Sequence, residues 1–175
     1  MAIVKPYQGR APKLEGPAFV AETAAIVGDV TLKRGTSVFY SAVLRADSGS
    51  ITIGENTNIQ DGAVLHTAAA HDVVVGSNVT IGHCALVHGC TVEDGALIGM
   101  HATVLSGAHI GAGSVVAAGG AGDRGHGGAA GQRGDGRARQ GARPGVAPAC
   151  RPCERGHRMV YPHRAFPRSR AARHR

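Results

Sequence analysis

Residues 74–116, VVGSNVTIGHCALVHGCTVEDGALIGMHATVLSGAHIGAGSVV, repeat a pattern every six residues. Every sixth position is aliphatic or threonine, and from Cys84 onward the position two residues earlier is small. A period of six fits neither the 3.6-residue turn of a helix nor the alternation of a free-standing strand. It predicts a three-sided solenoid with coils of about 18 residues that stack at roughly 4.8 Å. The residues expected to point inward here are Val74, Thr80, Leu86, Val92, Ile98, Val104, Ile110 and Val116.

The same pattern runs through the earlier part of the chain in two other phases. The first phase comprises Val20, Ile26, Leu32, Val38 and Leu44, and the second comprises Ile53, Ile59 and Leu65. Each change of phase spans nine residues, which predicts three inserted residues near positions 46–49 and again near positions 67–71. Insertions in a solenoid emerge as loops on one edge, often the edge that binds a ligand.

The composition suits narrow coils without a conventional aromatic core. The chain has 27 glycines, no tryptophan and only 3% aromatic residues, and coils filled with valine, isoleucine and alanine need no large rings. The N-terminus lacks an apolar stretch long enough for a signal peptide, and no stretch could span a membrane. Cys84 and Cys90 occupy expected inward positions, which favours buried, reduced thiols and a cytoplasmic protein.

The net charge of +7 comes from the C-terminal part of the chain. After Gly119 the six-residue pattern stops, and the basic residues are all arginine. A genuine basic extension that binds nucleic acid is one interpretation. The favoured one is a surplus guanine in the Gly119–Gly120 codons, because the restored frame can place valine at positions 122, 128 and 134. The expected domains are therefore a β-helix at residues 1–119 and an Arg/Gly-rich, disordered, out-of-frame tail at residues 120–175, with no nucleic-acid or membrane partner.

Three histidines stand out on this repeating frame. His66 follows inward Leu65 by one place, and His88 follows Leu86 by two, about one coil later. Their side chains are therefore expected at the same edge of neighbouring coils. His83 lies on a different part of the coil, so a neighbouring subunit would have to supply it. Three imidazoles with an open fourth position are typical of catalytic zinc sites; exposed or core-satisfied histidines are the alternative.

Four motifs, taken in order, resemble the gamma-class carbonic anhydrase family. They are VFYSAVLRAD at 38–47, NIQDGAVLH at 58–66, VTIGHCALVHGCT at 79–91 and LIGM at 97–100. The resemblance covers roughly residues 10–119. It implies an all-β, left-handed parallel β-helix of hexapeptide repeats and a homotrimer with zinc sites between subunits. It also implies that His66 and His88 come from one subunit and His83 from the next.

The resemblance assigns roles to four further residues. Arg45 and Asp47 look like the family's inter-subunit ion pair, with Asp61 nearby, although a purely structural role is an alternative for all three. Gln60 looks like the residue that hydrogen-bonds the zinc-bound water or the substrate. The implied activity is the reversible hydration of CO₂ to bicarbonate by metal-bound hydroxide.

The sequence departs from the family near the expected site. The loop after His66 is short and poor in acidic residues, so His71 is a candidate proton shuttle, with an ordinary loop histidine as the alternative. His101 lies 18 residues after His83 and is expected to stack beside that residue, as a solvated side chain or a support to the site.

Other functions remain open from the sequence. A hexapeptide-repeat acyltransferase or CoA-thioester hydrolase is one alternative, and a non-catalytic trimeric metal-binding scaffold is another. An open three-histidine site also suits Fe²⁺ or Co²⁺ in place of Zn²⁺.

Overall fold

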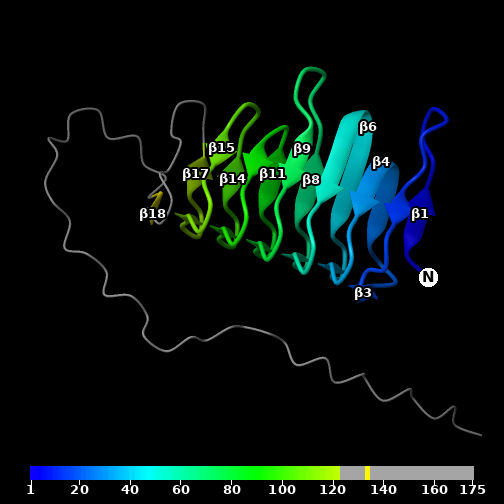
Figure 1. Cartoon of the computed structure of the whole chain (residues 1–175), viewed down its shortest axis with the longest axis horizontal. Coiled ribbons are helices and arrows are strands. Elements are labelled where there is room, and N and C mark those ends of the chain that lie inside the picture. Colours follow the sequence, from blue (N-terminus) through cyan, green and yellow to red (C-terminus); the bar gives the residue numbers. More distant parts are fainter. Residues whose placement is uncertain (123–132, 135–175) are drawn as a thin grey trace, which may run out of the picture. The chain divides into compact units, whose positions relative to one another are not determined.

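The computed structural model describes residues 1–122 and 133–134, which form strands and turns and contain no helix. All named strand pairs are parallel, as in β4 with β6, β8 with β11 and β10 with β13. Figure 1 shows successive coils stacked side by side along one axis. The predicted all-β, parallel β-helix is confirmed.

One side of the β-helix is a seven-stranded sheet, called here the β10 side. Each coil contributes one short strand to it, so the described residues build about seven coils. Its strands are β3 (Phe19–Val20), β5 (Ser37–Val38), β7 (Asn58–Ile59), β10 (Thr80–Ile81), β13 (Leu97–Ile98), β16 (Val115–Val116) and β18 (Arg133–Gly134).

An eleven-stranded sheet forms the other two sides. The long strands β4 (Ala25–Leu32) and β6 (Val43–Ile53) take part in both, because they continue from one side to the next. The β8 side adds β1 (Ile3–Lys5), β8 (Val64–His66), β11 (Leu86–His88), β14 (Thr103–Val104) and β17 (Ala121–Gly122). The β9 side adds β2 (Lys13–Leu14), β9 (Val73–Val75), β12 (Thr91–Val92) and β15 (His109–Ile110).

The core is a column of aliphatic side chains along the axis of the coils. Most predicted inward positions are buried, from Ile26 at 0% exposure to Val116 at 4%. Three predictions were wrong, because in the middle coils the next residue along the chain points inward instead. Val74 is 44% exposed and Val75 only 1%. The predicted and actual inward residues in these coils are Val74 and Val75, Thr80 and Ile81, and Leu86 and Val87.

Two compensating changes in coil length explain this shift. The inward residues Leu65 and Val75 are ten positions apart, so the loop between them holds one more residue than predicted. The next coil is one residue short, because inward Val87 and Val92 are only five positions apart. The sequence pattern conceals both changes, since aliphatic residues occupy either phase in this region.

One corner of five successive coils has a left-handed backbone. Positive φ angles of 55° to 68° occur at equivalent turns, at Ser41, Gly62, Cys84, His101 and Gly119. Cys84 is therefore an exposed corner residue, and its predicted inward position was wrong; Ala85 is buried there instead. Cys90 is buried as predicted, and burial raises the pKa of its thiol to about 12.

The two insertions lie at the edge between the β8 and β9 sides. In β6, the pairing changes from Gly28 with Ala46 to Val30 with Ile51, which places three extra residues in a bulge, as predicted. The second insertion follows β8 as a projecting loop, closed by an antiparallel bridge between Ala68 and His71 (Figure 1).

The coils continue past the predicted boundary at residue 119. Strand β17 pairs with β14, and β18 pairs with β16. The other residues of the predicted disordered tail, 123–132 and 135–175, lie outside the described part of the chain. Within the described part, no helix is long and apolar enough to cross a membrane.

Candidate metal centre

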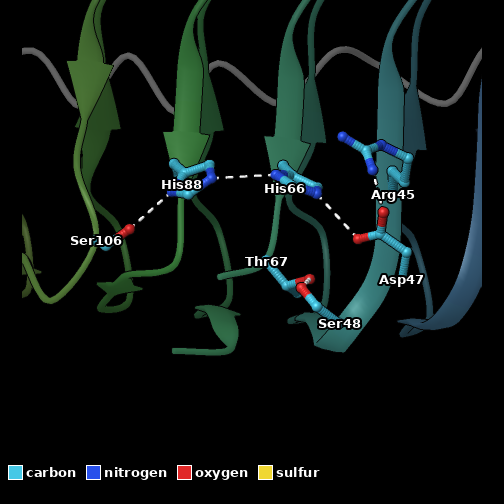
Figure 2. Close-up of polar contacts among 7 residues, drawn as sticks. All are labelled: Arg45, Asp47, Ser48, His66, Thr67, His88 and Ser106. Carbon is cyan, nitrogen blue, oxygen red and sulfur yellow. Dashed lines mark hydrogen bonds and ion pairs between the residues drawn. The ribbon is translucent and has the colours of Figure 1, made fainter. Parts of the chain in front are cut away.

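His66 and His88 lie side by side on the β8 side. The two residues pair directly in register between β8 and β11. Nδ1 of His66 is 3.1 Å from Nε2 of His88, and their ring centroids are 5.0 Å apart. Each histidine follows an inward residue by one place, Leu65 or Val87, so strand alternation turns both rings outward. Figure 2 shows them in one row, as the sequence predicted for the same edge.

Asp47 lies at the next position of this row (Figure 2). Its Oδ1 is 2.9 Å from Nε2 of His66, and its Oδ2 pairs with the Arg45 guanidinium. Burial opposes ionisation of Asp47, but the hydrogen bond from His66 and the charge of Arg45 together hold its pKa below the ordinary value. Within the single chain Arg45 contacts Asp47, because the two residues are two positions apart on β6 and so project from the same face of the strand.

The bulge that carries Asp47 is fixed from two directions. Ser48 Oγ lies 3.1 Å from Thr67 Oγ1, and the backbone N–H of Ser50 donates to Asp72 Oδ1 at 2.6 Å. Thr67 is completely buried. The two insertions are therefore linked by hydrogen bonds. Through these bonds, the loop after His66 helps to position Asp47, whose carboxylate contacts His66.

Ser106 completes the row beyond His88, a position that the sequence pattern did not predict. Its Oγ lies 2.7 Å from Nδ1 of His88 (Figure 2). Its separation of 18 residues from His88, about one coil, was the available signal. Burial, followed by the charges of His66 and Arg45, lowers the pKa of His88. The ring is therefore neutral at neutral pH, which is the form that binds a metal ion.

The other candidate residues lie at the opposite edge of the β8 side. His83 is in the turn before β11, and its Nδ1 is 3.0 Å from Asp61 Oδ2. Gln60 precedes Asp61 in the equivalent turn before β8 and is half-buried. His66 and His88, in contrast, are the last residues of their strands. Within the described residues, no group of three His, Cys, Asp or Glu side chains is placed to hold a metal ion.

The structure also places His71 and His101. His71 lies against Gly89, since a Cβ added to Gly89 would be 3.0 Å from the His71 Cβ; this brings the loop close to His88. His101 is exposed and its N–H donates to the carbonyl of His83. The short coil shifts the register by one residue, so His101 occupies the corner position equivalent to Cys84. The predicted stacking of His101 beside His83 is therefore displaced by one residue.

Comparison with known proteins identifies the family. No sequence profile of a known protein family matches the chain. The chain is 46% identical over 116 residues to gamma carbonic anhydrase 1, mitochondrial, from Arabidopsis thaliana. A solved hexapeptide transferase family protein from Anaplasma phagocytophilum superposes with a TM-score of 0.71 at 40% identity, over 75% of this chain and 77% of that one. The chain belongs to the hexapeptide transferase family, and several of its curated relatives are named gamma carbonic anhydrases.

The match to the curated relatives named carbonic anhydrases covers part of each protein. The Arabidopsis alignment spans 63% of this chain and 42% of the relative. A carbonic anhydrase from Geobacillus kaustophilus is 36% identical over 111 residues, which span 63% of this chain and 61% of that protein. The chain thus spans about half the length of the curated relatives it matches.

Proposed function

We propose that this protein is a zinc-dependent carbonic anhydrase-like enzyme that hydrates CO₂ reversibly to bicarbonate. The His66–His88 pair, with its rings 5.0 Å apart at one edge of the β8 side, carries the proposal. The two imidazoles point outward, and each contacts a polar partner, Asp47 for His66 and Ser106 for His88. They would supply the first two ligands of an open metal site. The names of the curated relatives, which are carbonic anhydrases, support the same activity.

The third ligand, His83, would come from a second copy of the chain in a homotrimer. His66 and His88 end their strands at one edge of the β8 side, and His83 lies at the opposite edge. An outward row of largely apolar residues crosses the strands beside them and is only half-buried in the single chain. A threefold arrangement would cover this row and bring unlike edges together. The row consists of Ala25, Val43, Val64, Leu86 and Thr103.

The residues at the His66 edge suit a divalent cation. Nδ1 of His66 and Nε2 of His88 face each other, so a cation held by both would replace the hydrogen bond between them. A zinc ion held there lowers the pKa of bound water toward about 7. Asp47 would fix the His66 tautomer by accepting a hydrogen bond from Nε2–H, and Arg45 would keep that carboxylate ionised.

The remaining candidate residues would handle the substrate and the proton. Gln60 would donate or accept a hydrogen bond at the reacting oxygen from the neighbouring subunit's edge, with Asp61 orienting the His83 ring. His71 would carry the proton away, because its loop packs against Gly89 beside His88. The site would also accept Fe²⁺ or Co²⁺, since imidazole ligands suit each of these ions.

We propose that the protein is located in the cytoplasm, a reducing compartment. The free thiols of Cys84 and Cys90 support this location. Cys84 and Cys90 form no disulfide in the described part of the chain, and Cys90 is buried with a pKa raised to about 12. The Arabidopsis relative is named as a mitochondrial protein. Fractionation of the native cells with an antibody to this chain would distinguish the two locations.

A second candidate is an acyltransferase, favoured by the solved neighbour named a hexapeptide transferase family protein. The test compares CO₂ hydration and acetyl-CoA consumption by the purified, zinc-loaded protein. CO₂ hydration that is lost in both His66→Ala and His88→Ala supports the carbonic anhydrase proposal. Acetyl-CoA turnover without CO₂ hydration would replace it with the transferase, and zinc binding without either activity would indicate a scaffold.

A further inference from the structure

We propose that Ser106 is a positioning residue for His88, and that its hydroxyl holds the ring in either tautomer as a metal ion binds or leaves. The inference rests on the proposed function for the identity of the metal ion. The direct contact of 2.7 Å between Ser106 Oγ and His88 Nδ1 does not depend on that function.

The direction of the hydrogen bonds follows from the carboxylate at the end of the row. Ionised Asp47 can only accept, so Nε2 of His66 carries the proton in this 2.9 Å contact. The Nδ1 atom of a neutral His66 is then bare and accepts from Nε2–H of His88, 3.1 Å away. Nδ1 of His88 is bare in turn, so Ser106 donates its hydroxyl proton to it. Without metal, both histidines are therefore Nε2–H tautomers.

Metal binding requires a different tautomer at only one of these rings. His66 presents a bare Nδ1 toward His88 in both states, because Asp47 keeps the proton on Nε2. His88 must release the proton from Nε2 to offer that atom to a cation, and a neutral ring then carries its proton on Nδ1. Ser106 must consequently change from donor to acceptor. A hydroxyl does this by rotating, whereas a carboxylate or an ammonium group cannot.

The surroundings of Ser106 leave space for its hydroxyl at this position. Gly89 follows His88 with a φ of 50°, and a Cβ added there would lie 3.1 Å from Ser106 Oγ. Because Gly89 has no side chain, the hydroxyl of the next coil reaches the His88 ring directly. The missing side chain at Gly89 and the serine one coil later thus act together to place a hydroxyl against the His88 ring.

The experiment measures the nitrogen chemical shifts of ¹⁵N-histidine-labelled protein and its zinc affinity by competition with a chelator. The variants are Ser106→Ala, which removes the hydroxyl, and Ser106→Thr, which retains it. Ser37→Ala, on the β10 side, is the control for loss of a serine elsewhere. The metal-free wild type should show Nε2–H tautomers at both His66 and His88, with the two signals assigned from His66→Ala and His88→Ala.

In Ser106→Ala, the His88 signals should shift toward a mixture of tautomers, and zinc affinity should fall about tenfold. In Ser106→Thr, the His88 shifts and the zinc affinity should both match the wild type. In Ser37→Ala, neither quantity should change. Unchanged His88 shifts in Ser106→Ala, or an equal loss of affinity in Ser106→Thr, would overturn the proposal. If the wild type binds no zinc, the proposed function fails. The tautomer shifts in the metal-free proteins then still decide the role of Ser106.

Discussion

His66 and His83 lie at opposite edges of the same side of the β-helix. His66 is the last residue of β8, whereas His83 lies in the turn that precedes β11. Each has its own carboxylate partner, Asp47 at 2.9 Å and Asp61 at 3.0 Å. In the proposed trimer, a single chain would therefore contribute two halves of two different sites, each half oriented by its own acidic residue.

The inward register of the middle coils can be tested with two adjacent valines. Val75→Ala removes a side chain that is 1% exposed and should lower the free energy of unfolding by about 2 kcal/mol, through lost burial and a residual cavity. Val74→Ala is the matched control, because Val74 is 44% exposed. Urea denaturation of both variants measures the difference. An equal loss in the two would contradict the observed register.

Gly89 should tolerate no side chain. Its φ of 50° disfavours any residue with a Cβ, and that Cβ would approach His71, Ser106 and Ala68 within 3.2 Å. Gly89→Ala should therefore destabilise the protein by about 2 kcal/mol or more. Gly95→Ala provides the control, since it shares a positive φ but has no atom within 4 Å of an added Cβ. Thermal melting should show a smaller loss for Gly95→Ala than for Gly89→Ala.

Gly122 occupies an inward position that holds an aliphatic residue in the preceding coils. It is buried opposite Val104, its φ lies outside the left-handed region, and an added Cβ would be 3.2 Å from Ile110 Cδ1. Gly122→Ala should stabilise the protein by about 1 kcal/mol, by burying a methyl group and restricting the unfolded chain. Gly119→Ala should destabilise it, because the φ of Gly119 is 67°.

A further variant at Gly122 bears on the favoured frameshift interpretation. The restored frame can place valine at residue 122, so Gly122→Val should be tolerated once the end of Ile110 moves by a few tenths of an ångström. A Gly122→Val protein that melts well below the wild type would argue against an out-of-frame origin for residues 120–175.

Stability in acid should depend partly on Glu93. Its carboxylate contacts His109 Nε2 at 2.7 Å and accepts the N–H of Ala112 at 2.7 Å, and these contacts lower its pKa below the ordinary 4.5. A lowered folded pKa adds stability that is fully present above pH 4.5 and is lost as the pH falls through the folded value. Glu93→Gln should therefore reduce the melting temperature at pH 7, with the difference from wild type shrinking at pH 3.

A difference between Glu93→Gln and wild type that is the same at both pH values would contradict this linkage. His109→Ala serves as the companion variant, because it removes the larger of the two contacts while leaving the Ala112 N–H in place. It should show a smaller pH-dependent loss than Glu93→Gln.

The sequence predicted the repeat well because aliphatic side chains at a six-residue spacing have few other ways to be buried. The register failed only where the pattern was degenerate. Val74 and Val75, or Leu86 and Val87, are aliphatic in both phases, so one extra loop residue and one missing corner residue left no trace in the hydrophobic pattern. Backbone pairing across coils, rather than composition, resolves such cases.

The sequence predicts the candidate site best for residues at equivalent positions of successive strands. It predicts the contacts of loop and turn residues less well. His66 and His88 each occupy the end of a strand, and their juxtaposition follows from the coil length. Ser106 escaped notice because serine is common in solenoid turns and carries no chemical signature alone. The contacts that hold the bulge, such as Ser50 N–H with Asp72 Oδ1, depend on the path of the two insertions, which an insertion count does not specify.

The most direct test of a site shared between subunits mixes two inactive variants. His83→Ala and His66→Ala proteins should each bind no zinc at the site when assembled alone. After co-refolding and isolation of mixed trimers with distinct affinity tags, each trimer should contain about one intact site, where a wild-type His83 faces a wild-type His66–His88 pair. Zinc measured by mass spectrometry at about one ion per mixed trimer is the predicted result. No recovered zinc in confirmed mixed trimers would contradict a site formed between subunits.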